Sequence, residues 1–426
     1  MNCIYTAKYL VSSNAPPVEG GALLAHAGQI AAVGTVAELK SNNPGVAVVD
    51  FADALLVPLL VNAHTHLELT DFPDWVENVG EGASPENFVD WILRLIRVKQ
   101  KLDKNQYQLS LSHGILQSVA AGTGAVGDIL AHHAARHLYQ NSPLVGSLFL
   151  ETLGQDPATI CRLRNGLSEA LKDEVVGLVE LGISPHSPYS ISQDYLKSIY
   201  ARCQHGKLRC TTHLAESSAE VEFVQRSQGD LASRLYPYIG WEGYIPLPSG
   251  QRPVEYLQQQ GGLFPENLLV HGVHLNNAEI EVLAEKQMWL ALCPRSNATL
   301  NVGKAPAGKL HRAGVKLALG TDSLASCDSL SIWDEMTFAH RWFNGELDAP
   351  TLFSMATQGG AEALGLENRI GSLETGKSAS FQILRPKTTV AADEIFDYFV
   401  SSDCTDDIVQ VYHRGQPQTI DKIVTD

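Results

Sequence analysis

The chain has 426 residues, of which 44% are hydrophobic and 18% charged, and its formal net charge at pH 7 is −16. This composition is ordinary for a globular protein, and no apolar stretch approaches the roughly 20 residues that span a bilayer. The negative charge and the lack of a clustered Lys/Arg run disfavour nucleic acid as a partner, so we expect small-molecule substrates.

The N-terminal 17 residues favour a cytoplasmic protein. They carry one early lysine and are interrupted by serines and prolines, so they lack the basic and apolar regions of a signal peptide. Seven scattered cysteines without a C-x-x-C pair argue against a disulfide framework or a structural zinc knuckle. A homodimer is compatible with these features.

The two ends of the chain predict one small β domain. Short β-branched runs at residues 30–36 and 46–51 lie between Gly and Pro, as in strands joined by turns. Strand-like runs of the same kind occur again at residues 381–384 and 408–412. We expect segments 1–54 and 366–426 to form a β-sandwich together.

The central part, residues 55–365, predicts a (β/α)8 TIM-type barrel. Strand-like runs and helical patterns alternate there, which is typical of βα units around a parallel sheet. The eight predicted strands are 55–62, 124–130, 145–152, 176–183, 208–212, 267–270, 288–293 and 315–320. In such barrels the active site lies at the carboxyl ends of the strands.

One βα connection, residues 217–260, is much longer than the others. It begins with a helical pattern and then places Tyr236, Tyr238, Trp241 and Tyr244 among Gly and Pro. Such a loop is compatible with a substrate lid, and equally with a packed surface excursion.

Candidate metal ligands follow the predicted strands. His64 and His66 end the first strand, and residues two apart on an extended strand point the same way, so both imidazoles can bind one ion. His213 follows the fifth strand and adds a third nitrogen, and Asp322 follows the eighth and adds an oxygen. This mixed set favours one Zn²⁺, with Fe²⁺ as the alternative.

Three side chains around such a metal predict hydrolytic chemistry. A divalent metal lowers the pKa of bound water to about 7 and so supplies hydroxide at neutral pH. Asp322 can accept the water's proton, and Glu216 can pass a proton to a ring nitrogen of the substrate. His271, after the sixth strand, can hydrogen-bond the attacking hydroxide or the developing tetrahedral centre.

Three further residues are candidate substrate contacts. His186 follows the fourth strand and is expected to touch the substrate rather than the metal. Glu68 lies just past the candidate metal histidines, and this position is compatible both with a substrate contact and with a structural carboxylate. Arg295 ends the seventh strand and either receives an anionic substrate group or forms an ion pair.

Several motifs together resemble the amidohydrolase superfamily. They are residues 61–66 (VNAHTH), 212–216 (THLAE), 270–272 (VHG), 293–297 (CPRSN) and 320–323 (GTDS), and residues 371–377 (GSLETGK) match the segment that returns to the family's β domain. The resemblance covers almost the whole chain. It implies His64, His66, His213 and Asp322 as metal ligands, Glu216, His271 and Asp322 in proton transfer, and His186 at the substrate base.

The resemblance is narrower to the aminohydrolase branch, which includes guanine, S-adenosylhomocysteine, methylthioadenosine and aminodeoxyfutalosine deaminases and the triazine chlorohydrolases. The adenosylhomocysteine and methylthioadenosine enzymes carry a ribose-binding glutamate nine residues after a tryptophan, and the matching position after Trp91 is Gln100. Residues 66–69 (HLEL) and 88–91 (FVDW) are more similar to aminodeoxyfutalosine-type deaminases.

We therefore expect a zinc-dependent aminohydrolase that deaminates a purine-like heterocycle, with an adenosine-type nucleoside as the leading substrate and release of ammonia. The alternatives are a guanine or other base deaminase, a triazine-type chlorohydrolase, and a non-catalytic ligand-binding barrel. Residues 371–378 (GSLETGKS) match the phosphate-binding loop of nucleoside triphosphatases, but such a loop opens a helix. Here an extended run follows, so we interpret the match as part of the β domain.

Overall fold

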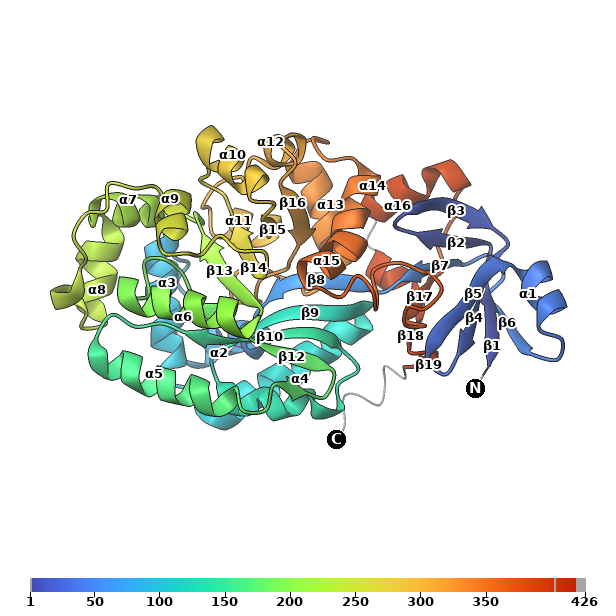
Figure 1. Ribbon diagram of the computed structural model, residues 1–426, viewed down its shortest axis with the longest axis horizontal. Helices are drawn as coiled ribbons and strands as arrows, with labels where there is room; N and C mark the ends of the chain where they lie inside the picture. The colour runs from blue at the N-terminus through green and yellow to red at the C-terminus, as the bar shows by residue number, and fades with distance from the viewer. Residues whose placement is uncertain (1, 402–403, 419–426) are drawn as a thin grey trace.

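A parallel β-barrel occupies the centre of the molecule in the computed structural model, which describes residues 2–401 and 404–418 (Figure 1). Its strands are β8 (Leu60–Thr65), β9 (Thr123–Leu130), β10 (Val145–Thr152), β12 (Val179–Pro185), β13 (Cys210–Leu214), β14 (Asn267–His271), β15 (Trp289–Leu292) and β16 (Lys316–Leu319). They are hydrogen-bonded in that order, and the short β11 (Val175–Val176) is antiparallel to β12. The prediction of a (β/α)8 barrel is confirmed.

The first and last strands meet through the final residues of β8 and the residues just past the end of β16. An isolated parallel bridge joins Thr65 to Asp322, and the Asp322 backbone N–H donates to the His64 carbonyl oxygen over 3.1 Å. Gly320 makes this approach possible, because a Cβ at that position would lie 2.7 Å from the His64 Cβ. Barrel closure therefore places Asp322 directly beside His64 and His66.

Helices cover the barrel and complete the βα units. They are α2 (Phe72–Asn78), α3 (Phe88–Lys99), α4 (Lys104–Ala120), α5 (Pro157–Ala170), α6 (Gln193–Gly206), α7 (Ser218–Arg226), α8 (Tyr236–Tyr238), α9 (Pro253–Gln259), α10 (Asn277–Glu285), α11 (Pro294–Thr299), α12 (Ala307–Arg312), α13 (Ile332–Trp342), α14 (Ala349–Ser354) and α15 (Gly360–Ala363). Within the described residues, none of the helices is both long and apolar enough to cross a membrane.

Two further sheets form a β-sandwich at one end of the molecule (Figure 1). One contains β5 (Gln29–Thr35), β4 (Gly21–His26), β1 (Cys3–Thr6) and β6 (Ala47–Asp50), in that order; the other contains β19 (Gln416–Pro417), β18 (Ile408–His413), β17 (Phe381–Leu384), β7 (Leu55–Pro58), β2 (Tyr9–Ser12) and β3 (Ala15–Glu19). Tyr5 of the first sheet packs on Phe381 and Tyr412 of the second, with ring centroids 5.0 and 5.1 Å away. The expected pairing of the two chain ends is confirmed.

The predicted first barrel strand, residues 55–62, is two strands that belong to different sheets. β7 pairs with β17 and β2 in the sandwich, and only β8 enters the barrel. Both strands are buried throughout, so the hydrophobic pattern contains no sign of the change between them. Helix α1 (Val36–Asn42) lies within the N-terminal segment that was expected to contain only strands, and its capping box of Thr35 and Glu38 is the local signal for it.

The C-terminal segment also contributes to the barrel layer. Helix α16 (Ile395–Ser401) lies between strands β17 and β18, and its Phe399 ring is 5.1 Å from the ring of Trp333 in α13. The ring of Phe353 in α14 lies 4.9 Å from the Phe399 ring. The described part of segment 366–426 therefore supplies strands to the sandwich and also a helix that packs on the barrel helices.

The long connection 217–260 folds into α7, α8 and α9 and packs on its neighbours. The Tyr236 hydroxyl donates to the Tyr189 carbonyl oxygen over 2.7 Å, and the Trp241 indole N–H donates to Asp156 over 3.0 Å. Phe223 and Trp241 share a buried cluster with Phe88 of α3. The contacts agree with a packed excursion, and movement of this segment as a lid stays a prediction.

Candidate active site

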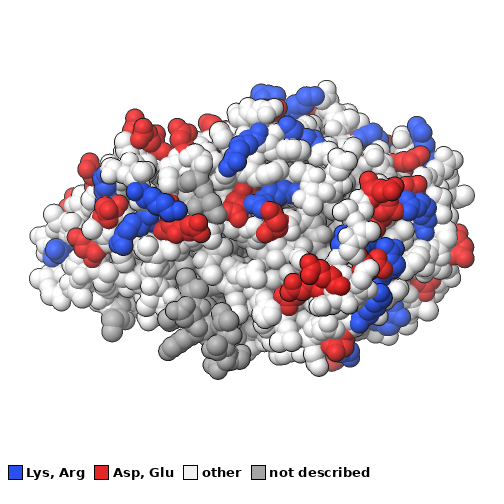
Figure 2. All heavy atoms as spheres, turned by 180° about the vertical axis from the view of Figure 1, so that it is seen from behind, with Lys and Arg blue, Asp and Glu red and all other residues white. Residues whose placement is uncertain are grey.

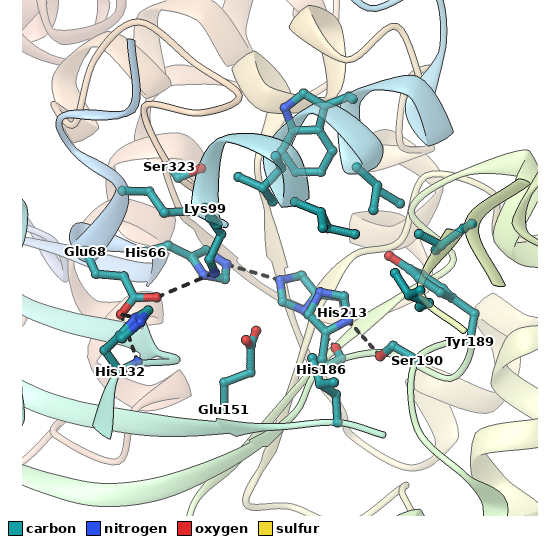
Figure 3. Close-up of a pocket in the computed structure, with 18 of the residues that line it drawn as sticks. His66, Glu68, Lys99, His132, Glu151, His186, Tyr189, Ser190, His213 and Ser323 are labelled. Carbon is teal, nitrogen blue, oxygen red and sulfur yellow. Dashed lines mark hydrogen bonds and ion pairs between the residues drawn. The ribbon is translucent and has the colours of Figure 1, made fainter. Parts of the chain in front are cut away.

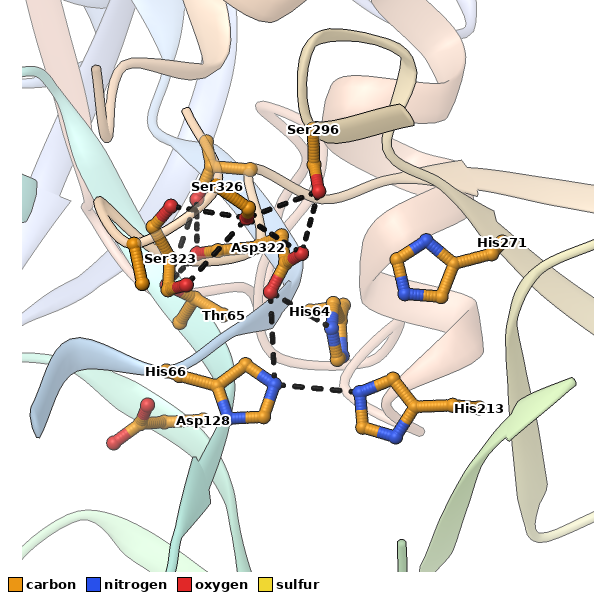
Figure 4. Close-up of polar contacts among 12 residues, drawn as sticks. His64, Thr65, His66, Asp128, His213, His271, Ser296, Asp322, Ser323 and Ser326 are labelled. Atoms are coloured by element: carbon orange, nitrogen blue, oxygen red, sulfur yellow. Dashed lines mark hydrogen bonds and ion pairs between the residues drawn. The ribbon is translucent and has the colours of Figure 1, made fainter. Parts of the chain in front are cut away.

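The carboxyl ends of the barrel strands bring the four predicted metal ligands together (Figure 4). The Nε2 atoms of His66 and His213 are 3.3 Å apart, and Asp322 Oδ1 lies 3.7 Å from His64 Nε2 and 3.6 Å from His66 Nε2. Metal–nitrogen bonds of about 2.0–2.1 Å in a tetrahedral site place neighbouring ligand atoms about 3.4 Å apart. The spacing of these donor atoms therefore fits one metal ion.

The chemistry of the three histidines agrees with that geometry. Both ring nitrogens of His64 are buried, and neither has a hydrogen-bond partner among the described residues, which is costly unless a ligand satisfies one of them. His213 Nδ1 donates to the His186 carbonyl oxygen over 2.7 Å, so its Nε2 lone pair faces the site. Burial, with the neighbouring His64, lowers the pKa of His66 to about 3. Neutral imidazoles are the form that binds metal, so these residues fit a divalent cation.

Two serines hold the carboxylate of Asp322. Ser296 Oγ and Ser326 Oγ donate to Asp322 Oδ2 over 2.6 and 2.8 Å, which leaves Oδ1 facing the histidines (Figure 4). Burial alone would raise the pKa of Asp322, but the adjacent His64, His66 and His271 hold it well below its ordinary value. Asp322 is therefore an ionised carboxylate with one oxygen directed at the metal site.

Glu216 is placed by a strained turn directly after β13. Ala215 has a φ of 52°, and its N–H and that of Glu216 donate to the two carboxylate oxygens of Glu220, each over 2.8 Å. Burial, together with the charges of Asp322 and Glu220, raises the pKa of Glu216 well above its ordinary value. The surroundings of the two carboxyls thus move the pKa of Glu216 up and the pKa of Asp322 down, the separation that acid/base catalysis by two carboxyls requires.

His271 is the last residue of β14 and also has a positive φ, of 73°. Its Nδ1 is 3.0 Å from Asn297 Oδ1, so Nδ1 carries the proton and Nε2 accepts hydrogen bonds. Burial lowers the pKa of His271 to about 4, and Nε2 lies 3.7 Å from Glu216 Oε1. A neutral imidazole therefore lies beside the Glu216 carboxyl.

A cavity of about 560 Å³ opens onto these groups, a volume that suits a small ligand (Figure 3). One part of its wall is apolar and consists of Trp91, Ile92, Leu95, Ile96, Leu153, Leu235, Ile239 and Trp241. The other part is polar and includes Glu68, Lys99, Tyr107, His132, Glu151 and His186 together with the metal-site residues. The cavity therefore joins a hydrolytic centre to an amphipathic binding space.

His186 and Glu68 both line the cavity, as predicted for substrate contacts, but their surroundings differ. His186 Nδ1 is 2.8 Å from the hydroxyls of Ser187 and Ser190, and burial lowers its pKa to about 4. Glu68 accepts from the backbone N–H groups of Ala131 and His132 over 3.2 and 3.0 Å. Contact of His186 with the substrate stays a prediction, and Glu68 has a clear structural role.

The interpretation of Arg295 as a substrate contact is not supported. Its guanidinium forms an ion pair with Asp328 and lies 3.5 Å from Asp334, and it is absent from the residues that line the described cavity. Its backbone N–H donates to Glu335 Oε1 over 2.9 Å. Helix α11 begins directly after β15 and turns the side chain toward this acidic group, so the ion-pair alternative applies.

Glu151, Lys99 and Tyr107 also line the cavity and were not among the predicted site residues. Glu151 lies near the end of β10, so the same rule that found the metal ligands, a polar residue at the carboxyl end of a barrel strand, would have found it. Lys99 ends α3, and Tyr107 lies in α4. No local pattern distinguishes these two from other helix residues.

A closed parallel barrel with three histidines and an aspartate at its strand ends defines a metal-dependent hydrolase. Residues 55–417 match the model of the amidohydrolase family, and the chain belongs to that family. It is thus a hydrolase of carbon–nitrogen bonds. The phosphate-loop match at residues 371–378 belongs to the β domain, since Lys377 pairs with Glu374 at 2.9 Å and the strand β17 follows instead of a helix.

The chain is similar to known deaminases over most of its length. The chain is 31% identical to a 5′-deoxyadenosine deaminase of Methanothermobacter thermautotrophicus, over 81% of this chain and 77% of that protein. It is 31% identical to an aminodeoxyfutalosine deaminase of Deinococcus radiodurans, over 79% of each. The crystal structure of an adenosine deaminase from Xanthomonas campestris with bound zinc has a TM-score of 0.81 at 23% identity and covers 100% of this chain and 94% of its own.

Proposed function

We propose that this protein is a zinc-dependent aminohydrolase that replaces the exocyclic amino group of an adenosine-type nucleoside with oxygen and releases ammonia. The observation that carries the proposal is the pair of carboxyls at the candidate metal site, Glu216 and Asp322, which line one cavity and whose surroundings move their pKa values in opposite directions. The names of the two 31%-identical relatives support a nucleoside with an adenine base. The zinc in the structure from Xanthomonas campestris supports the choice of metal.

The metal would be held by His64, His66, His213 and Asp322. A divalent cation in such a site activates water at neutral pH. Asp322 Oδ1 accepts a proton from the attacking water, because its other oxygen is already bound by Ser296 and Ser326.

Glu216 supplies the complementary proton. Its protonated carboxyl donates to the ring nitrogen next to the carbon that carries the amino group, so that this carbon becomes electrophilic. The water oxygen forms a bond to the carbon, and the carbon–nitrogen bond breaks as the amino group takes the proton held on Asp322 and leaves as ammonia. The remaining proton of the added hydroxyl passes to Glu216, which restores its carboxyl as the carbon–oxygen double bond forms. His271 Nε2 accepts a hydrogen bond from the attacking water and so orients it.

The remaining features favour a small molecule. Trp91, Leu235 and Trp241 in the apolar wall bury an aromatic ring and exclude water from it. The net charge is −16, and on the face in Figure 2 the Lys and Arg side chains of the described residues are interspersed with Asp and Glu. This distribution supports small-molecule recognition rather than binding to a phosphate backbone.

The direct test is ammonia release by purified protein of known metal content. The panel consists of adenosine, methylthioadenosine, S-adenosylhomocysteine, aminodeoxyfutalosine, guanine and an aminotriazine. We expect turnover of at least one adenosine-type nucleoside and a much lower kcat/KM for guanine and the triazine. If the metal-loaded protein releases no ammonia from any nucleoside, or acts on guanine or the triazine instead, the proposal is wrong.

A further inference from the structure

The carboxylate of Glu151 faces the cavity with no hydrogen bond or ion pair to its oxygens from any described residue (Figure 3). The backbone at this position is fixed, because the Glu151 carbonyl oxygen accepts from His133 Nε2 over 2.8 Å. The Glu151 side chain is half-buried in the cavity wall, and desolvation there raises its pKa. Its carboxylate oxygens are thus accessible from the cavity and can accept from a donor that a ligand supplies.

The other carboxylates around the cavity either have hydrogen-bond partners in the protein or belong to the proposed hydrolytic centre. Glu68 accepts two backbone N–H groups, lies 3.4 Å from His132 Nδ1, and lies 4.0 Å from Lys99 Nζ. Asp322 and Glu216 belong to the hydrolytic centre. Among the acidic residues that line the described cavity, Glu151 is therefore the one whose acceptor capacity is open to a ligand.

The neighbouring charge restricts what that ligand group can be. Lys99 lines the same cavity as Glu151 and His186, and its Nζ lies 4.0 Å from Glu68 Oε1. Its positive charge partly offsets the rise that burial causes in the pKa of Glu151. A cationic ligand group at Glu151 would meet repulsion from Lys99, whereas an anionic group would meet repulsion from Glu151. A neutral hydroxyl avoids both penalties, because it can donate to the carboxylate and also accept from a nearby ammonium.

We propose that Glu151 is the acceptor for the sugar hydroxyls of the substrate and thereby selects ribonucleosides over nucleosides that lack these hydroxyls. The inference rests on the proposed function, since it assumes that the substrate's amino-bearing ring lies between Glu216 and the metal ligands. Glu151 leaves the third barrel strand beside this centre, and in Figure 3 its carboxylate points into the space below His66 and Lys99. A sugar attached to that ring can reach the carboxylate within the same cavity.

The test compares two substrates in two proteins. For the wild type, kcat/KM for adenosine should exceed that for 2′,3′-dideoxyadenosine by about 10- to 100-fold, the range for hydrogen bonds to a charged group. In Glu151→Gln this ratio should fall to within about threefold, because the amide lacks the charge and one acceptor. Glu169→Gln, an exposed change on α5, serves as the control and should keep the wild-type ratio. An unchanged ratio in Glu151→Gln, or no preference in the wild type, overturns the inference.

A binding measurement separates this inference from the proposed reaction. Calorimetric titration with inosine and 2′,3′-dideoxyinosine should show tighter binding of inosine by the wild type, and a much smaller difference for Glu151→Gln. If adenosine is not deaminated but this hydroxyl-dependent binding is present, the proposed function fails and the role of Glu151 stands. If adenosine is deaminated while both inosines bind equally well to the wild type, the role of Glu151 is refuted.

Discussion

Replacement of Glu220 by glutamine tests how the catalytic carboxyl of Glu216 is positioned. Glu220 accepts the N–H groups of Ala215 and Glu216 over 2.8 Å each and thereby clamps the turn in which Ala215 has a φ of 52°. A glutamine amide can accept only one of the two, so one hydrogen bond to a charged group is lost, worth about 1.5–3 kcal/mol. If that energy is needed to hold the reactive geometry, kcat/KM falls by about 10- to 100-fold.

The free energy of unfolding should change much less than activity. Burial raises the pKa of Glu220 to about 7, which shows that its negative charge is costly in the folded protein. The neutral glutamine avoids this cost, which offsets part of the free energy lost with the hydrogen bond. The assay is steady-state ammonia release at about pH 8, where the wild-type carboxyl is mostly ionised. Metal content and thermal unfolding are measured in parallel, and Glu222→Gln, an exposed change on the same helix, is the control.

Two results would refute this reasoning. The first is wild-type kcat/KM in Glu220→Gln. The second is an additive loss when Glu220→Gln is combined with Glu216→Gln, because a residue that acts through Glu216 should have little further effect once Glu216 has lost its function.

Four other predictions follow from the site. Glu216→Gln should lower kcat by about 10²-fold or more while metal content stays the same, and full activity in this variant would remove the assigned acid role. Chelation of the metal should abolish turnover and lower the melting temperature, with recovery on addition of Zn²⁺; a chelated protein that remains active would contradict the ligand set. The folded-state pKa of Glu220, about 7, lies above its ordinary 4.5, so the folded state binds more protons between these values. The wild type should therefore lose stability relative to Glu220→Gln as pH rises through this window. If the free energies of unfolding of the two proteins change in parallel with pH, the raised pKa of Glu220 is wrong. Lys377→Ala should leave ammonia release unchanged, since Lys377 pairs with Glu374 in the β domain, and a loss of activity would revive a role for the phosphate-loop match.

Part of the site was predictable because barrel topology turns sequence order into proximity. His64, His213 and Asp322 are far apart in the chain, but each lies at or just past the end of a strand whose periodic pattern is local. In a closed parallel barrel all carboxyl ends meet at one end, so recognition of the strands is enough to expect these side chains together. The structure brings His213 within the span of one ion with His64 and His66, and it places Asp322 Oδ1 3.7 Å from His64 Nε2.

The partners of individual side chains depended on the tertiary structure. Arg295 and Glu151 both lie at strand ends, yet the structure turns Arg295 toward Asp328 and Asp334 and leaves Glu151 facing the cavity. Nothing in the neighbouring sequence distinguishes these two outcomes, because the acidic partners come from a different part of the chain.

The sequence by itself determined the barrel, the pairing of the chain ends and the candidate metal ligands, because strand periodicity and the residues that follow each strand are local properties. The tertiary structure decided the division of residues 55–62 between two sheets, because β7 and β8 are equally buried and only their strand neighbours differ. It also decided which polar residues at the cavity are already satisfied and which remain open to a ligand, because hydrogen-bond satisfaction is set by long-range neighbours.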